Sequence, residues 1–218
     1  MQRRDFSRRI AALTGLGVGL GGPLAAQAQG APREGTHYVK LGSPAPVTLP
    51  AGKAVEVVEF FWYGCPHCYA FEPTLEAWVK RLPADVAFRQ VPVGFMAPHQ
   101  YHARLFYALE ETGALGTMHR RVFNAIHQQG KRLNSDADIA AFAKDSGVDG
   151  DKLVQAMKGF SVSTKATRAK QLADAYKIDG VPAVGVHGRF YTAASLAGSH
   201  ERAVQVADFL IQLARQKA

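Results

Sequence analysis

A strand-forming run that ends on a Cys-Pro-His-Cys turn is the feature that most constrains this chain. Residues 55–61 read VEVVEFF, a nearly continuous apolar and β-branched run that is typical of a strand covered on both faces. Gly64 and the motif at residues 65–68 follow, and apolar residues then recur at helical spacing up to Leu82. Strand, tight turn, Cys-x-x-Cys and helix in this order place a sulfur at the N-terminus of a helix.

The two cysteines of the chain are Cys65 and Cys68. A structural disulfide stabilises mainly by removing entropy from a long loop, and two intervening residues make a minimal loop. The pair is therefore predicted to be a redox reagent and not a structural cross-link. An inert surface disulfide is one alternative, and half of a zinc site is another. His99 and His102 could supply two further zinc ligands, but there is no second cysteine pair and nothing links these histidines to the first. No metal is expected.

The two sulfurs are expected to differ. At the helix N-terminus, unpaired N–H groups favour a negative charge on Cys65, and His67 adds a polar or cationic neighbour. Pro66 suits the first helical turn, where its missing N–H costs little. Cys68 lies one turn further in and is expected to be the buried, resolving thiol. A stabilised Cys65 thiolate favours the reduced form, which makes the disulfide an oxidant.

The N-terminus has the pattern of a removable export signal. Four arginines precede an apolar, glycine-rich stretch, and Ala26-Gln27-Ala28 fits a cleavage site. Residues 1–28 are therefore predicted to be a cleaved signal peptide, because the apolar run is too short for the alternative, a membrane anchor. Arg3-Arg4-Asp5-Phe6 also fits a twin-arginine (Tat) signal, and the choice between Sec and Tat export stays open. Either route predicts a periplasmic protein, in a compartment where disulfides persist.

Charge argues against a nucleic-acid partner. The net charge of the whole chain is +8 and falls to +5 without residues 1–28, which carry four Arg and one Asp. No polybasic tail or Arg/aromatic array is present, so nucleic-acid binding is not expected.

The rest of the chain predicts an α/β protein. A C-x-x-C near a βαβ pattern indicates a thioredoxin-like fold, here with an inserted helical domain. The thioredoxin-like domain is predicted to comprise residues 38–97 and 161–218, and the insert residues 98–160. The expected strands are 38–41, 55–61, 86–93, 183–186 and 189–191, and Pro73 is expected to kink the first helix. Further helices are expected at 99–112, 115–127, 136–146, 150–158, 163–176 and after Ser199.

At these residues the chain resembles the DsbA family of periplasmic thiol:disulfide oxidoreductases. The resemblance rests on Glu59-Phe60-Phe61, on the Cys-Pro-His-Cys-Tyr segment that starts at Cys65, on Phe71-Glu72, on the helical insert, and on Gly180-Val181-Pro182. That family is the usual example of an acidic, oxidising cysteine, so the direction of electron flow is an expectation taken from the resemblance.

The resemblance also implies roles. Cys65 would be the attacking cysteine and Cys68 its buried partner. Val181-Pro182 would be a cis-proline pair that faces the disulfide and pairs with an extended substrate peptide, where the alternative is an ordinary trans proline. Glu59 would be a buried acid that handles protons, where the alternative is an exposed edge-strand glutamate. Trp62, Tyr63 and Phe95 are expected either to line a peptide groove or to pack in the core.

The implied activity is donation of the Cys65–Cys68 disulfide to reduced exported polypeptides through a mixed disulfide. A DsbB-type, quinone-linked membrane oxidase would reoxidise the enzyme, which would act as a monomer without a cofactor. A disulfide reductase or isomerase on the same fold is the alternative, although isomerases of this group usually carry a dimerisation domain and residues 29–54 are too few for one. A peptide-binding chaperone or adaptor with incidental cysteines is a third hypothesis.

Overall fold

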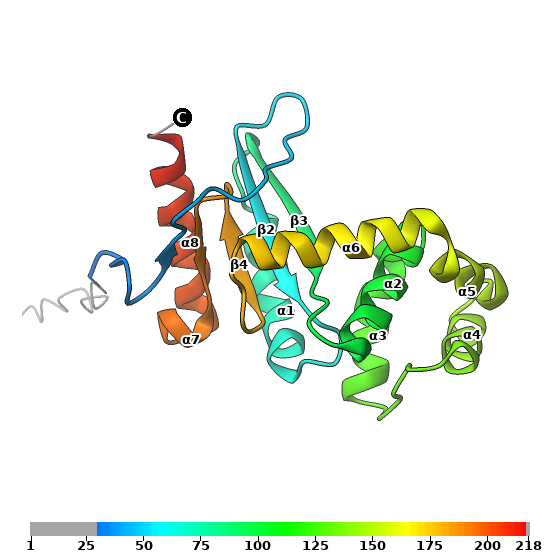
Figure 1. The fold of residues 1–218 in the computed structure, drawn as a ribbon. Helices are drawn as coiled ribbons and strands as arrows, with labels where there is room; N and C mark the ends of the chain where they lie inside the picture. The colour runs from blue at the N-terminus through cyan, green and yellow to red at the C-terminus, as the bar shows by residue number, and fades with distance from the viewer. Residues whose placement is uncertain (1–29, 217–218) are drawn as a thin grey trace, which may run out of the picture. The chain divides into compact units, whose positions relative to one another are not determined.

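The computed structural model describes residues 30–216, and the predicted signal peptide at residues 1–28 lies outside them. The residues from Pro32 onward form one compact unit, drawn in Figure 1. Within the described residues, no helix is long and apolar enough to cross a membrane.

A five-stranded mixed sheet forms the centre of this unit. Its strand order is β1-β5-β4-β2-β3, in which β2 and β3 are parallel and the other neighbours are antiparallel. The strands are β1 (Val39–Lys40), β2 (Val55–Phe61), β3 (Val86–Pro92), β4 (Ala183–Val186) and β5 (Phe190–Thr192). All seven residues of β2 are buried, as expected for an apolar strand covered on both faces.

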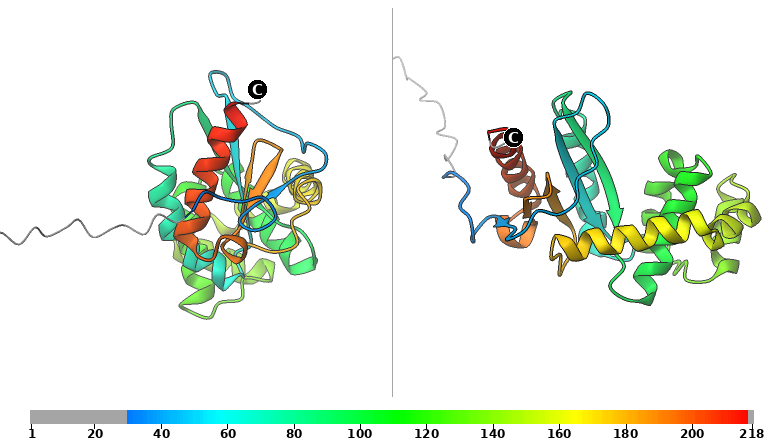
Figure 2. Two further views of the ribbon diagram at one scale, coloured as in Figure 1. Left: turned by 90° about the vertical axis from the view of Figure 1, so that its left-hand side faces the viewer. Right: turned by 45° about the horizontal axis from the view of Figure 1, so that its top comes forward.

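Helices cover both faces of the sheet. On one face, α1 (Pro66–Val79) and α8 (His200–Arg215) pack with Val55 and Val57 of β2 in a single apolar cluster. On the other face, α6 (Phe160–Ala175) leads to Tyr176, whose ring meets Phe60 at a centroid distance of 5.1 Å. Figure 2 shows α6 and α8 on opposite sides of the strands. This layering buries β2 completely and carries its C-terminal end to the cysteine motif.

Four helices lie between β3 and α6 in the chain. They are α2 (Ala97–Glu111), α3 (Leu115–His127), α4 (Asp136–Asp145) and α5 (Gly150–Lys158). Ser135 and Asp149 cap α4 and α5, because each side chain accepts a backbone N–H of the first turn. The predicted α/β, thioredoxin-like fold with inserted helices is confirmed, while the exact domain boundaries at residues 97–98 and 160–161 stay a prediction.

Two details of the expected helices differ. The first helix ends at Val79, although apolar spacing continued to Leu82; Leu82 packs on the same core from the turn after the helix, so the pattern outlasts the helix. Helix α1 continues through Pro73, and the kink expected there stays a prediction. Helix α7 (Ala194–Ala197) was not predicted, because four residues are too few to show a helical period.

Candidate active site

Cys65 is the N-cap residue of α1. Its backbone is extended and its Sγ accepts the backbone N–H of Cys68 at 3.4 Å, while Pro66 takes the first helical position. The Cys65 N–H donates to the Trp62 carbonyl at 3.0 Å, which closes the turn after β2. Cys65 is 8% exposed, Cys68 is fully buried, and both are free thiols. The predicted positions of both sulfurs are therefore those found in the structure.

The pKa of Cys65 is lowered from the 9.0 of an ordinary thiol to about 6. The largest cause is the hydrogen bond from the Cys68 side chain, and burial of the sulfur opposes it. The backbone N–H groups of Cys68 and His67 and the charge of His67 lower the pKa further. Cys65 therefore holds a thiolate near neutral pH, in the form that attacks disulfides.

The pKa of Cys68 is shifted in the opposite direction. Burial raises it first, and the hydrogen bond with Cys65 and the negative charges of Cys65 and Glu59 raise it further. The pKa values of two sulfurs three residues apart are thus shifted in opposite directions. This difference assigns the ionised role to Cys65 and the protonated role to Cys68 when the pair is reduced.

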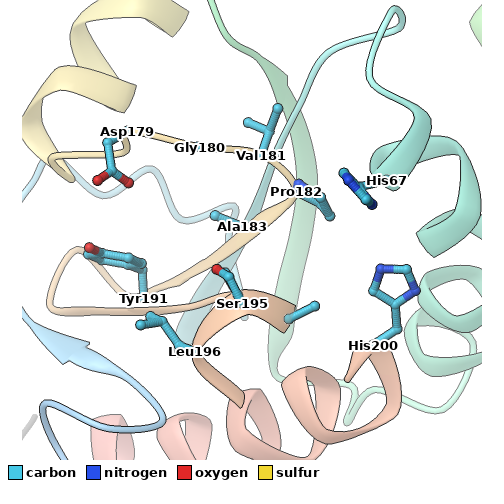
Figure 3. A pocket seen from close by; sticks show the side chains of 12 residues that line it. His67, Asp179, Gly180, Val181, Pro182, Ala183, Tyr191, Ser195, Leu196 and His200 are labelled. Atoms are coloured by element: carbon cyan, nitrogen blue, oxygen red, sulfur yellow. The ribbon is translucent and has the colours of Figure 1, made fainter. Parts of the chain in front are cut away.

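The Val181–Pro182 segment faces the reactive sulfur. The peptide bond before Pro182 is cis, as the resemblance implied, and the Cys65 thiol donates to the Val181 carbonyl at 3.4 Å. Beside them lies a pocket of about 540 Å³. Figure 3 shows exposed His67 next to Pro182, with Tyr191 and Leu196 further along the pocket wall. The pocket therefore extends from the active-site turn along the segment that follows α6.

Glu59 is fully buried in β2, so the alternative of an exposed edge glutamate is wrong. The parallel register sets Gln90 of β3 beside it, and the Gln90 amide Nε2 donates to Glu59 Oε2 at 2.8 Å. The other carboxylate oxygen, Oε1, has no hydrogen-bond partner. Burial raises the pKa of Glu59 well above its ordinary value, and the charge of Glu72 raises it further.

Sequence reasoning missed a polar cluster around Glu59. Glu72 of α1 and His119 of α3 join Gln90 and the Tyr63 hydroxyl there. Glu72 lies four residues after Cys68, on the same face of α1, which is a signal that could have been used. No local pattern marks His119, because only the docking of α3 against α1 brings it to the cluster.

Tyr63 belongs to the core and not to a groove. It is fully buried, and its ring packs on Phe61 and Phe123 at centroid distances of 5.2 and 5.0 Å. Trp62 and Phe95 are partly buried, and neither lines the pocket next to Cys65. The Trp62 ring lies over Gly64, where an added Cβ would come within 2.3 Å of it, so this glycine makes room for the indole.

The two histidines considered as zinc ligands, His99 and His102, both belong to α2. Both ring nitrogens of His102 have protein partners, Trp62 Nε1 at 3.0 Å and the Leu133 carbonyl at 3.2 Å. Across residues 30–216, no group of three or more His, Cys, Asp or Glu side chains is arranged to hold a metal ion.

Comparison with known proteins places this geometry in a family. Residues 56–203 match the model of the DSBA-like thioredoxin domain. The chain belongs to the DsbA family. Thiol:disulfide interchange protein DsbA of Burkholderia cepacia is 42% identical over 202 residues, covering 93% of this chain and 95% of the relative. The protein of the same name from Bordetella parapertussis is 42% identical over 217 residues, covering 99% and 100%.

Solved DsbA structures have the same fold. The crystal structure of Pseudomonas aeruginosa DsbA matches with a TM-score of 0.79 at 42% identity, covering 84% of this chain and 94% of that one. DsbA of Xylella fastidiosa matches with a TM-score of 0.79 at 30% identity, covering 86% and 100%. This DsbA-family chain is a thiol:disulfide oxidoreductase that acts on substrate proteins. The names of these relatives give no support to the reductase or isomerase alternative.

Proposed function

We propose that this DsbA-family protein oxidises the thiols of exported polypeptides in the periplasm. A substrate thiolate attacks Cys65 Sγ, the Cys65–Cys68 bond breaks, and its electron pair leaves on Cys68. A second substrate thiolate then attacks the substrate sulfur of the mixed disulfide and expels Cys65 as a thiolate. One substrate dithiol becomes a disulfide, and the enzyme disulfide is reduced to a Cys65 thiolate and a Cys68 thiol. Of the two substrate protons, one makes up for the proton that Cys68 takes up, and the other is released to solvent.

The observation that carries this proposal is the opposite character of the two sulfurs. Cys65, with a pKa of about 6, is the better leaving group of the pair, because thiols of low pKa leave faster. Cys68 is fully buried, so substrate reaches only Cys65. A stabilised Cys65 thiolate lowers the free energy of the reduced form, which drives electrons from substrate to enzyme.

The substrate peptide is proposed to lie in extended form along Val181-Pro182. The Val181 carbonyl already accepts a hydrogen bond from the Cys65 thiol, which places this backbone within reach of a chain joined to that sulfur. The pocket next to it is mostly apolar, with His67 and His200 at its border, and would receive a neighbouring substrate side chain.

Glu59 is proposed to supply the proton that Cys68 takes up. Its negative charge is one of the causes that raise the pKa of Cys68, so the Glu59 carboxyl and the Cys68 sulfur interact electrostatically. Its own raised pKa keeps a proton available at pH values where an exposed carboxyl has lost it.

The remaining parts of the proposal come from the family resemblance. A DsbB-type, quinone-linked membrane oxidase would take the electrons from the reduced cysteine pair, and the enzyme would work as a monomer without cofactor or metal. Residues 1–28 would direct export by the Sec or Tat route.

The test is oxidation of a reduced, unfolded protein by the purified oxidised enzyme, followed by thiol counting. Stoichiometric oxidation is expected, together with an equilibrium against glutathione in which the enzyme is the stronger oxidant. We expect Cys65→Ser to abolish oxidation. Cys68→Ser, prepared as an activated mixed disulfide on Cys65, is expected to exchange with one substrate thiol and to accumulate as the enzyme–substrate mixed disulfide. An enzyme more reducing than glutathione, or one that acts only on scrambled disulfides, would contradict the proposed direction.

A further inference from the structure

A buried polar cluster behind the cysteines contains more groups than the thiol chemistry uses. One end of the Gln90 amide lies 2.8 Å from Glu59 Oε2 and 3.0 Å from His119 Nε2. His119 Nε2 also lies 3.4 Å from Glu72 Oε2, and His119 Nδ1 lies 2.8 Å from the Tyr63 hydroxyl. His119 thus contacts three side chains of the cluster, those of Gln90, Glu72 and Tyr63, through its two ring nitrogens.

The shared Gln90 atom couples Glu59 to His119. The NH₂ end of an amide donates to both neighbours, and the carbonyl end accepts from both. When the NH₂ end faces them, Glu59 is an ionised acceptor and His119 Nε2 offers its lone pair. When the carbonyl end faces them, Glu59 donates as a neutral acid and His119 Nε2 carries a hydrogen. A proton on Glu59 Oε1 would face no partner, whereas a proton on Oε2 finds an acceptor in the Gln90 carbonyl. A neutral Glu59 that carries its proton on Oε2 therefore goes with a hydrogen on His119 Nε2.

The Tyr63 hydroxyl pairs with His119 Nδ1 in both tautomers. With the proton on Nδ1, the Tyr63 hydroxyl accepts it; with the proton on Nε2, the Tyr63 hydroxyl donates to Nδ1. Glu72 Oε2 is a second acceptor for the Nε2 hydrogen. Neutral histidine is a side chain that exchanges a donor and an acceptor between fixed positions without moving. The Tyr63 contact is therefore kept in either tautomer, while the Glu72 contact favours the hydrogen on Nε2.

Polar and charged groups surround His119 on the sheet side, on the α1 side and at the protein surface. Glu59 and Gln90 face it from the sheet, Glu72 and Tyr63 from α1 and the turn before it. At the outer side, the Arg120–Glu76 ion pair of 2.6 Å joins α3 to α1. The His119 side chain is 13% exposed and Glu59 is fully buried, so His119 is also the more accessible of the two.

We propose that His119 is a positioning residue that lets Glu59 alternate between its neutral and ionised forms during the thiol–disulfide cycle, by changing tautomer as the Gln90 amide turns. When the disulfide opens, the Glu59 proton passes to Cys68 and leaves a carboxylate. Gln90 then presents its NH₂ end to that carboxylate, and His119 Nε2 accepts the second N–H. This inference rests on the proposed role of Glu59 in the reaction.

The test replaces His119 by Leu, which neither donates nor accepts, and by Gln, whose amide does both. The readout is the carboxylic-acid C=O band of Glu59, identified by its loss in Glu59→Gln and followed by infrared spectroscopy against pH in the reduced protein. In H119L the second Gln90 N–H has no partner when Glu59 is ionised, so the Glu59 midpoint is expected to rise by about one pH unit, a tenfold change in proton binding. H119Q is expected to keep the wild-type midpoint.

His127 gives a matched control on the same helix. Its Nε2–H donates to the Tyr63 carbonyl, 2.7 Å away, and its ring stacks on Tyr69, so His127→Leu removes a similar partly buried imidazole from α3. Its Glu59 midpoint is expected to equal that of the wild type. An unchanged midpoint in H119L, or equal shifts in H119L and H119Q, would overturn the inference. If Glu59→Gln oxidises substrate with the wild-type pH profile, the proposed role of Glu59 fails instead, whatever the infrared midpoints are.

Discussion

At the scale of single residues, the chemistry of this protein follows from placing two like side chains in unlike surroundings. Cys65 caps a helix and receives hydrogen bonds, so its charged form is favoured. Cys68 lies one turn deeper, with apolar packing and Glu59 nearby, so its neutral form is favoured. The hydrogen bond between the two side chains, the backbone N–H groups at the helix terminus and the burial of Cys68 together separate the two pKa values.

The contribution of the Cys68 side chain to the Cys65 pKa is directly testable. The ultraviolet absorbance of the thiolate is expected to titrate with a midpoint of about 6 in the reduced protein. Cys68→Ala removes the largest cause of the lowered pKa, the side-chain hydrogen bond, so the midpoint is expected to move up toward that of an ordinary thiol. Cys68→Ser keeps a donor and is expected to give a smaller rise. Equal midpoints for the two variants would show that the hydrogen bond is not the main cause.

Residues differ in how far the sequence revealed them. Cys65 and Cys68 could be placed because strand, turn and helix adjoin in the chain, and the family resemblance pointed to Glu59 and Val181-Pro182. The Gln90 contact required the β2–β3 register, and His119 required the docking of α3 on α1. Contacts between distant segments leave no period or spacing in a sequence, so this half of the site was not predictable from it.

At the scale of elements, the helices between β3 and α6 depend on close packing as well as on their caps. Gly150 opens α5 and is buried, and an added Cβ would lie 2.3 Å from the Ala140 carbonyl oxygen of α4. Because that neighbour is backbone, it cannot move aside as a flexible side chain would. The glycine therefore fixes how closely α4 and α5 approach.

Gly150→Ala is expected to destabilise the protein by about 1–3 kcal/mol, the usual cost of overpacking, despite the better helix propensity of alanine. Gly116→Ala is the matched control, since Gly116 lies in α3 with nothing within 4 Å of an added Cβ. That variant is expected to be stabilised by up to about 1 kcal/mol. Urea denaturation of both, compared with wild type, checks the pair; a stabilised Gly150→Ala would show that α4 and α5 separate at little cost.

At the scale of the whole molecule, the pKa of one sulfur is tied to the stability of the entire fold. The oxidised protein has no thiol to ionise, so only the reduced protein gains from a favoured thiolate. The pKa of Cys65 in the folded protein, about 6, is below the 9.0 of an ordinary thiol, so folding stabilises its charged form. That contribution is complete above about pH 9 and is lost as the pH falls through about 6. The same free energy favours the reduced form over the disulfide, so it also makes the disulfide a stronger oxidant.

The free energy of unfolding of the reduced protein is therefore expected to rise, relative to that of the oxidised protein, by roughly 2–4 kcal/mol between pH 6 and pH 9. Above pH 9 the gain should level off and then reverse, because the raised pKa of buried Cys68 lets the unfolded chain ionise that thiol first. Urea denaturation of both redox forms at a series of pH values measures the difference. Cys65→Ser lacks the ionising group and forms no disulfide, so its free energy of unfolding is compared with that of the oxidised wild-type protein. It is expected to show no rise over the same interval, and a rise that persists would place the linkage at another residue.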